Sequence, residues 1–485
     1  MLNVGWQTLL VLAIDWLIRI GLSIRVIMRR RPVGVSLAWI AVVLMLPLLG
    51  TVVYLMFGEL RLGRARAARA QAIHAPYAAW LVSLRSRYPY HDDDDGTRPP
   101  SLARVIEAGS GYPPLPGNAI ELLKNSEDCF REIVRDIEAA KSTCHLEFYI
   151  WSAGGRADDV VEALCRACAR GVTVRVLVDS VGSAHFLASP QASRLRASGA
   201  ELHAALPVRF WRFFLERFDL RLHRKIIVID GKIGYTGSLN IADPRYFKAD
   251  AGVGQWVDAM VRLRGPAVEA LAVTFIEDWE LETGIGLDAL ISKSDLRDQP
   301  LHGASQVQVI PSGPNAPPEL MKAVLLQAIY AARTELVLTT PYFIADESIL
   351  MALASAASRG VQVHLVIPKL IDSKLVALAS QSFAGDLARA GVHIWRFHGG
   401  LLHTKSITVD GRFCLFGSLN LDPRSLVLNF EITLAIYDAE FTSELRALQE
   451  TYIASSTKFD IEAWLDRSWP LRLAENAARL AGPLL

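Results

Sequence analysis

The feature that most constrains this chain is a long internal repeat. The stretch LHRKIIVIDGKIGYTGSLN begins at Leu222, and the similar stretch LHTKSITVDGRFCLFGSLN begins at Leu402. In each copy the stretch is preceded by a β-branched run, a helical pattern and a second β-branched run that starts with Arg-Gly-Val. A repeat of this length predicts two similar structural units, packed about a pseudo-two-fold axis.

The predicted elements of both copies alternate between strand and helix. Strands are expected over 144–151, 170–179, 334–343 and 359–368, and helices over 158–169 and 348–358. Gly171 and Gly360 stand just after the two helices, where a C-cap glycine is favoured. The sequence therefore predicts an α/β fold with two similar domains of mixed, largely parallel sheets flanked by helices, over residues 111–295 and 296–485.

The front of the chain is its most apolar part. Residues 33–57 form a run of 25 without a charged side chain, long enough for one helix to cross a bilayer. Pro47 lies within this run, and membrane helices tolerate such a kink. An earlier apolar stretch, 6–28, carries three charges and fits either a second span or a helix lying in the interface. We predict a membrane segment of one or two helices over 1–60 and a juxtamembrane linker over 61–110.

Three stretches leave alternatives open. Arginine clusters flank the longer apolar run on both sides, so the positive-inside rule does not decide which side the rest of the chain occupies. The run HDDDDG at residues 91–96 is better interpreted as a solvated part of the linker than as a metal site. The aromatic and basic stretch 207–223 fits an interfacial membrane segment and a packed amphipathic helix equally well.

Charge and cysteine content exclude several classes of protein. The net charge of +1 provides no basic field, so no nucleic-acid partner is expected. The five cysteines are odd in number and scattered, which is not typical of a disulfide framework. Cys165 and Cys168 form a C-x-x-C pair within a helical pattern, without a second pair of ligands. Neither a metal nor a cofactor is therefore predicted.

Both copies share a signature of polar residues at fixed spacing. The first copy contains His223, Lys225, Asp230, Ser238 and Asn240. The second copy contains, at matching positions, His403, Lys405, Asp410, Ser418 and Asn420. Residues two apart on a strand point to the same face, so each copy brings an imidazole and an ammonium to one target. Two facing copies would form a pocket of imidazoles, ammoniums, amides and hydroxyls that suits a phosphate oxyanion.

Two histidines can divide a phosphodiester transfer between them. One imidazole attacks phosphorus and forms a phosphohistidine, while the other protonates the leaving alcohol and then deprotonates the incoming one. The charge of the transition state would be held by the lysines and asparagines of the signature, Lys225, Lys405, Asn240 and Asn420. Ser238 and Ser418 would add hydroxyl donors to the phosphate site.

Two acidic residues downstream of the motifs are candidates to orient the histidines. A nucleophilic imidazole presents one nitrogen while an acceptor holds the other. Asp258 follows His223 by 35 residues and Glu431 follows His403 by 28, each within a strand-like run. We predict that each acid orients the histidine of its own copy, the alternative being an ordinary surface carboxylate.

The aspartates of the signature have a different expected role. Asp230 and Asp410 belong to the catalytic signature, yet each directly precedes a glycine at the end of a strand. Aspartate before glycine favours a turn. We therefore expect these two side chains to hold a turn rather than to contact substrate.

The paired signature resembles that of the phospholipase D superfamily. Within this superfamily, the layout of the whole chain is similar to that of the bacterial cardiolipin synthases. The features that carry this resemblance are the apolar front, both copies of the repeat and the stretch NLDPRSLVLNFE at 420–431. Members of the superfamily often have Gly-Gly where this chain has Gly237 and Ser238. This departure bears on headgroup preference rather than on the type of reaction.

The resemblance implies a transphosphatidylation without a cofactor. One phosphatidylglycerol would transfer its phosphatidyl group to His223 and release glycerol; a second would accept the group with His403 as general acid and base, giving cardiolipin. The implied partners are phosphatidylglycerol, other anionic phospholipids and the bilayer, and the implied location is the bacterial inner membrane, with the N-terminal helices as anchor.

Other functions would use the same residues. A phospholipase D-type hydrolase would accept water, and another phosphatidyltransferase would accept a different alcohol, and both remain open. A nuclease of the superfamily fits poorly with an apolar front and a near-neutral charge. A catalytically silent membrane scaffold would need neither histidine.

Overall fold

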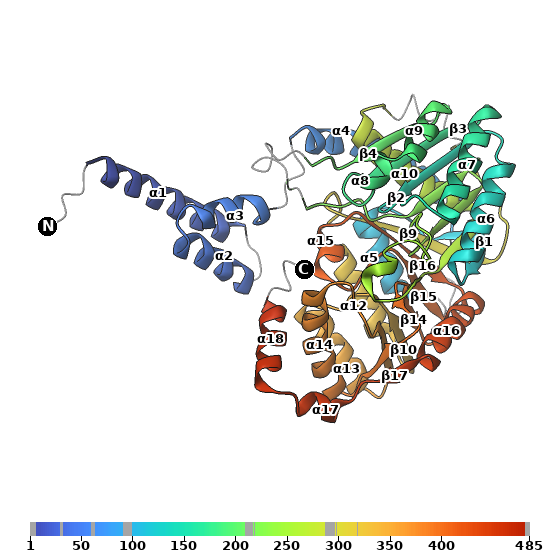
Figure 1. The fold of residues 1–485 in the computed structure, drawn as a ribbon. Coiled ribbons are helices and arrows are strands. Elements are labelled where there is room, and N and C mark those ends of the chain that lie inside the picture. Colours follow the sequence, from blue (N-terminus) through green and yellow to red (C-terminus); the bar gives the residue numbers. More distant parts are fainter. Residues whose placement is uncertain are drawn as a thin grey trace. The chain divides into compact units, whose positions relative to one another are not determined.

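The computed structural model describes most of the chain. The described residues are 6–29, 33–59, 64–90, 99–208, 217, 219–286, 296, 298–317 and 319–480. The aspartate run at 91–96 and most of the aromatic stretch at 207–223 lie outside them. The chain divides into two compact units, Met1–Ala68 with Val208–Leu220, and Arg69–Pro207 with Arg221–Leu485. Both copies of the repeat belong to the second unit (Figure 1).

The first unit contains α1 (Trp6–Met28), α2 (Val33–Met45) and α3 (Leu49–Phe57). The run that was expected to form one helix is therefore two, which corrects that prediction. Pro47 has no N–H to continue the helical hydrogen bonds, and Leu48 adopts a left-handed φ of 55°. None of the described helices combines the length and the low charge that crossing a bilayer requires.

Several described charged side chains of the first unit pair with one another, whereas many of its large apolar side chains are exposed. Asp15 and Arg19 form a buried ion pair one helical turn apart, and Arg25 contacts Glu59 at 2.5 Å. Many large apolar side chains are exposed on the same helices, among them Leu9, Leu10, Leu12, Leu17, Ile20, Ile24, Ile27, Leu37 and Met45. This distribution is the reverse of the pattern usual for a water-soluble domain.

The second unit is built on one sheet of 15 strands. In spatial order the strands are β17 (Ser456–Lys458), β12 (His393–Phe397), β11 (Gln362–Pro368), β10 (Glu335–Thr339), β14 (Lys405–Val409), β15 (Phe413–Gly417), β16 (Glu431–Tyr437), β9 (Ser305–Ser312), β1 (Leu115–Leu123), β8 (Met260–Arg264), β6 (Ile233–Gly237), β5 (Ile226–Ile229), β2 (Thr143–Phe148), β3 (Thr173–Asp179) and β4 (Glu201–Ala205). The order β12-β11-β10-β14-β15-β16-β9 of one repeat matches β4-β3-β2-β5-β6-β8-β1 of the other. The repeats meet where β1 pairs with β9, as a pseudo-two-fold relation requires.

The sheet is mixed, and its pairing corrects the expectation of largely parallel strands. Parallel pairs join β2, β3 and β4 in one repeat and β10, β11 and β12 in the other, while the remaining neighbours are antiparallel. Two of the antiparallel pairs follow from tight turns, at Asp230–Gly231 and Asp410–Gly411, which connect β5 to β6 and β14 to β15. A turn this short can only connect antiparallel strands.

Helices cover the sheet and enclose one apolar core in each repeat (Figure 1). The helices of the first repeat are α6 (Ser126–Ala139), α7 (Arg156–Ala169), α8 (Ala184–Leu187), α9 (Pro190–Ala197) and α10 (Pro266–Thr283). Those of the second are α12 (Leu320–Ala331), α13 (Glu347–Ser358), α14 (Lys374–Arg389), α15 (Pro423–Val427), α16 (Ala439–Ala454), α17 (Ile461–Leu465) and α18 (Trp469–Leu480). Cys165 and Cys168 lie on α7, where the helical pattern was predicted.

The stretch expected as a linker contains two further helices, α4 (Arg64–Arg87) and α5 (Pro100–Ser110). Trp80 and Arg87 of α4 both bond to the buried carboxylate of Glu269 on α10, at 3.0 and 2.6 Å. Gln308 of β9 donates to the carbonyl of Ala103 on α5. These contacts make both helices part of the body that carries the two repeats.

Candidate active site

Each histidine of the signature is held against the opposite repeat by its backbone. The N–H of His223 donates to the carbonyl of Phe430 at 2.8 Å, and the N–H of His403 donates to the carbonyl of Val257 at 2.9 Å. The second contact continues a short parallel pair, β7 (Trp256–Val257) with β13 (Leu401–Leu402). Phe430 directly precedes Glu431, and Val257 directly precedes Asp258. The backbone of each histidine is therefore paired with the residue just before an acidic residue of the other repeat.

This register pairs the histidines and acids across the repeats. Nδ1 of His223 lies 2.8 Å from Glu431 Oε2, and Nδ1 of His403 lies 2.6 Å from Asp258 Oδ1. The two acids were expected to orient the histidines, and they do bond to them. The expected pairing within one repeat was wrong, because the strands that carry the acids approach the motif of the other repeat.

Burial sets the protonation of these pairs. Burial lowers the pKa of His223 and of His403 to about 4, with Glu431 and Asp258 opposing the shift and the neighbouring lysines adding to it. Burial alone would raise the pKa of Asp258, but His403, Lys405 and Ser238 hold it at about 2. The pKa of Glu431 is likewise held below its usual value by His223. At neutral pH the acids are ionised and the imidazoles neutral, so each Nδ1–H donates to a carboxylate and leaves Nε2 as the nucleophilic nitrogen.

The serines expected to bind phosphate hold the acids instead. The hydroxyl of Ser238 donates to Asp258 at 2.6 Å, and that of Ser418 donates to Glu431 at 2.5 Å. Both serines are fully buried, and their oxygens accept from the backbone N–H of Ala259 and Ile432. Since each hydroxyl has one proton and gives it to a carboxylate, the two serines fix the acids rather than contact a ligand.

The lysines of the signature are buried beside the histidines. Nζ of Lys225 donates to the carbonyl of His223 at 2.7 Å, and Nζ of Lys405 donates to that of His403 at 2.6 Å. Burial lowers the pKa of Lys225 to about 8 and lowers that of Lys405 well below its usual value. Each ammonium has three N–H donors, so a bound phosphate can accept from the same group.

The aspartates of the signature stand in tight turns, and their carboxylates bond the backbone of a neighbouring segment rather than the turn itself. Asp230 accepts from the backbone N–H groups of Lys141, Ser142 and Thr143, and Asp410 accepts from those of Arg333, Thr334 and Glu335. Both aspartates have a left-handed φ, 54° and 52°, next to the glycine of the hairpin. They stand at the far end of β5 and β14 from the histidines.

The two histidines open into one cavity of about 400 Å³. Asn240 and Asn420 line it, and the oxygen of Asn240 accepts from the N–H of Ile150 at 3.1 Å, which directs its NH₂ group to a ligand. Other lining residues were not singled out from the sequence: Tyr149, Trp256, Tyr342, Arg221, Arg424, Lys248 and Asp372. Trp256 could have been found, since it precedes Asp258 by two in a strand-like run.

Aromatic rings cover both imidazoles. The ring centroids of Tyr149 and His223 are 4.9 Å apart, and those of Trp256 and His403 are 4.4 Å apart. These rings exclude water from the imidazoles and contribute to the burial that keeps them neutral.

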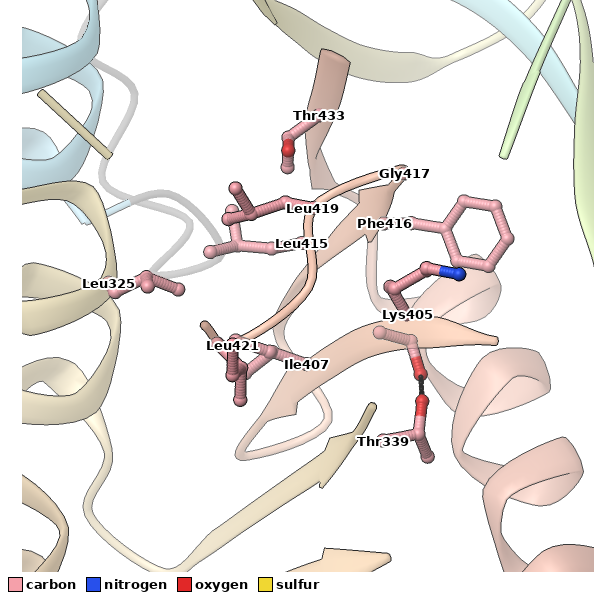
Figure 2. Close-up of a pocket in the computed structure, with 11 residues that line it drawn as sticks. Leu325, Thr339, Lys405, Ile407, Leu415, Phe416, Gly417, Leu419, Leu421 and Thr433 are labelled. Carbon is pink, nitrogen blue, oxygen red and sulfur yellow. Dashed lines mark hydrogen bonds between the residues drawn. The ribbon is translucent and has the colours of Figure 1, made fainter. Parts of the chain in front are cut away.

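A second, much smaller cavity lies beside Lys405 within the core of the second repeat (Figure 2). Its volume is about 20 Å³, enough for roughly one water molecule. Leu325, Leu415, Leu419 and Leu421 form much of its wall, and Figure 2 shows the Nζ end of Lys405 pointing away from these leucines. This cavity is a packing void and not a substrate site.

Comparisons with known proteins identify the family. Residues 133–279 and 325–452 match the family described as cardiolipin synthase, PLD-like domain, and residues 17–59 match the phospholipase D-nuclease N-terminal family. Cardiolipin synthase A of Klebsiella pneumoniae subsp. pneumoniae is 44% identical over 472 residues, covering 97% of each chain. The chain belongs to the PLD-like cardiolipin synthase family.

Further relatives agree with this membership. Cardiolipin synthase A of Escherichia fergusonii is 45% identical over 472 residues, again covering 97% of each chain. Among solved structures, phosphatidylserine synthase of Haemophilus influenzae Rd KW20 has a TM-score of 0.58 at 16% identity, covering 79% of this chain and 100% of that one. The latter likeness concerns the fold, which is that of a PLD-like protein with two repeats.

Proposed function

We propose that this chain is a cardiolipin synthase that converts two molecules of phosphatidylglycerol into cardiolipin and glycerol. One observation carries the proposal. Two neutral imidazoles, each bonded through Nδ1 to a buried carboxylate, line one cavity, and a buried lysine donates to the carbonyl of each histidine. This arrangement offers one nucleophile, one proton carrier and two cations to a single phosphodiester.

In the first step Nε2 of His223 attacks the phosphorus of the donor. The N–P bond forms as the P–O bond to glycerol breaks, and His403 gives its proton to the leaving oxygen. His403 is neutral in the empty site, and the negative charge of the bound phosphodiester raises its pKa so that it can carry this proton. Lys225 and Lys405 stabilise the charge on the non-bridging oxygens.

In the second step the primary hydroxyl of another phosphatidylglycerol attacks the phosphohistidine. Its proton passes to Nε2 of His403, the new O–P bond forms, and the N–P bond to His223 breaks. This restores the protonated His403 of the substrate-bound state, and the ring gives the proton to solvent when cardiolipin leaves and the empty, neutral site returns. Glu431 and Asp258 keep both rings in place throughout, as positioning residues rather than as proton carriers.

Product analysis tests this proposal directly. Purified full-length protein in mixed micelles would be given phosphatidylglycerol and an excess of chelator, and cardiolipin, glycerol and phosphatidic acid would be quantified. We expect cardiolipin and glycerol in equal amounts. Phosphatidic acid as the main product would make the enzyme a hydrolase, and a product that appears only with an added alcohol would make it a different phosphatidyltransferase.

The first unit supports a membrane location. Among its described residues Asp15 pairs with Arg19 and Arg25 with Glu59, and many large apolar side chains are exposed on its helices, a distribution that is stable against lipid and unfavourable against water. We infer that α1, α2 and α3 hold the enzyme on the bacterial inner membrane, where its lipid substrates are found.

Glycine substitutions test this role of the first unit. A Cβ at Gly50 would lie 2.2 Å from the carbonyl oxygen of Val42, whereas Gly21 and Gly34 have open space around them. Gly50→Leu should separate α3 from α2 and reduce the fraction of enzyme that floats with liposomes, with activity in micelles retained. Gly21→Leu is the matched control and should float like the wild type; equal flotation of all variants would contradict the inference.

A further inference from the structure

The proposed transfer involves two phosphodiesters, and the residues discussed so far account for one. The histidines and the lysines of the signature surround the phosphorus of the donor. The acceptor lipid brings its own phosphate, which only three carbons and one oxygen separate from the attacking hydroxyl. An anion this close to the reaction centre is best balanced by a cation beside the general base.

Lys248 provides a cation on that side of the cavity. It lines the cavity together with Trp256 and His403. Its Nζ lies 5.6 Å from the ring centroid of Trp256, and this ring packs on His403 at 4.4 Å. We propose that Lys248 binds the phosphodiester of the acceptor phosphatidylglycerol and so favours a phospholipid over water or a simple alcohol. This inference rests on the proposed function.

The present partner of Lys248 can be displaced. Nζ of Lys248 lies 3.1 Å from Asp372 Oδ2, and the other oxygen of Asp372 accepts from the hydroxyl of Tyr342 at 2.9 Å. The lysine side chain is 47% exposed, so this ion pair contributes little stability. Tyr342 retains Asp372 when Lys248 turns to a phosphate.

The backbone at Lys248 also sets this residue apart. Its φ of 49° and ψ of 36° are left-handed, a conformation that residues other than glycine rarely adopt. Such conformations persist where surrounding structure enforces them, and they concentrate at ligand sites. Here the conformation begins the short turn η2 (Ala249–Ala251) and carries the lysine to the cavity.

The arginines that line the cavity belong to its other side. Arg221 precedes His223 by two residues, and its carbonyl accepts from the N–H of Phe430 at 2.9 Å. Burial raises the pKa of Tyr149, the charges of Arg221 and Arg424 oppose this rise, and the ring of Tyr149 packs on His223. They therefore flank the nucleophile, whereas Lys248 flanks the general base.

Two reactions of the same phosphohistidine test the proposal. Full-length enzyme in mixed micelles with phosphatidylglycerol would be assayed for cardiolipin formation, and in parallel for exchange of labelled glycerol into phosphatidylglycerol. Glycerol carries no phosphate, so it does not need Lys248. We expect Lys248→Met to lower the ratio of cardiolipin formation to glycerol exchange about tenfold or more, the usual effect of losing a charged hydrogen bond. Lys248→Arg should restore most of the ratio.

Two control variants separate phosphate binding from a structural role. Lys374→Met removes an exposed lysine from the first turn of α14 and should leave the ratio unchanged. Asp372→Asn breaks the ion pair but spares Lys248, so the ratio should stay or rise. A fall with Asp372→Asn as large as with Lys248→Met would show that only the ion pair matters, and would overturn the proposal.

Other outcomes are equally decisive. Equal losses of both reactions in Lys248→Met, in an enzyme whose wild type makes cardiolipin, would overturn the inference and leave the proposed function standing. A ratio that falls with Arg424→Met and not with Lys248→Met would place the acceptor on the other flank and overturn it as well. A wild type that exchanges glycerol but makes no cardiolipin would overturn the proposed function and the inference with it.

Discussion

At the scale of residues, each imidazole depends on a carboxylate that is distant in the sequence. His223 and Glu431 are separated by 208 positions, and His403 and Asp258 by 145. Because each acid bonds to the histidine of the other repeat, Glu431 positions the nucleophile and Asp258 positions the proton carrier. The two acids should therefore have different kinetic effects when they are replaced.

A donor with a good leaving group distinguishes these effects. Phosphatidyl p-nitrophenol needs no protonation on leaving, so the first step depends on His223 and not on His403. Asp258→Asn should then give a normal burst of nitrophenol followed by turnover slowed roughly 10²-fold, whereas Glu431→Gln should slow the burst itself by a similar factor. Rapid-quench kinetics measures both phases. The opposite assignment of effects would contradict the crossed roles.

The pH dependence of the reaction should reflect Lys225. Burial places its pKa at about 8, so the ammonium is charged below that pH and loses its proton as the pH rises through it. The value of kcat/KM should therefore fall above about pH 8, because a neutral amine no longer attracts the phosphodiester. Because burial also lowers the pKa of Lys405, the plateau should extend to higher pH only when Lys225→Arg and Lys405→Arg are combined, at some cost in rate. A wild-type profile that stays flat to pH 10 would refute this prediction.

At the scale of elements, the Asp-Gly hairpins tie each motif strand to the rest of its repeat. Asp230 satisfies three backbone N–H groups ahead of β2, and its substitution leaves those donors without a charged acceptor. Asp230→Ala should lower the free energy of unfolding by about 2–3 kcal/mol while the activity per folded molecule stays within a few-fold. Thermal unfolding and active-site titration measure the two quantities. Asp410→Ala is the matched variant; loss of chemistry without loss of stability would assign these aspartates a catalytic role.

The elements also show which features local sequence can predict. The strand-helix-strand units follow from periodicity alone, and β2, α7 and β3, like β10, α13 and β11, lie where they were predicted. His223 and Lys225 were expected on one strand, but both precede β5, which begins at Ile226, so that part of the prediction was wrong. The antiparallel centre of the sheet was signalled by the Asp-Gly pairs, whose turns were predicted without the consequence for strand direction. Pro47 was expected to bend one helix, but whether a proline kinks or ends a helix depends on what the following residues pack against, here Gly50 on Val42.

Long-range features could not be predicted in this way. The acids were identified by their position in strand-like runs, yet which histidine each one meets depends on the pairing of the two repeats. The same holds for Lys248. Its neighbour Asp372 comes from the other repeat, and its neighbour Trp256 comes from β7 of its own repeat. Such contacts are properties of the assembled sheet and not of any window of sequence.

At the scale of the whole molecule, the two repeats share one sheet through the pairing of β1 with β9. A continuous sheet with interleaved active-site strands should unfold as one cooperative body rather than as two domains. We expect denaturant curves followed by tryptophan fluorescence and by residual activity to coincide for the body that holds both repeats. Two separated transitions would contradict this expectation.

The pairing of each histidine with a carboxylate of the other repeat also has a consequence during translation. A chain still on the ribosome carries His223 long before Glu431 has been synthesised, and its imidazole then lacks the acceptor that aims it. On the proposed role of α1, α2 and α3, such a nascent chain would already be held at a lipid surface, in the presence of its substrate. Premature attack on phospholipids is thereby avoided without an inhibitor or a pro-segment, since the chemistry becomes possible only when translation has delivered the last third of the second repeat.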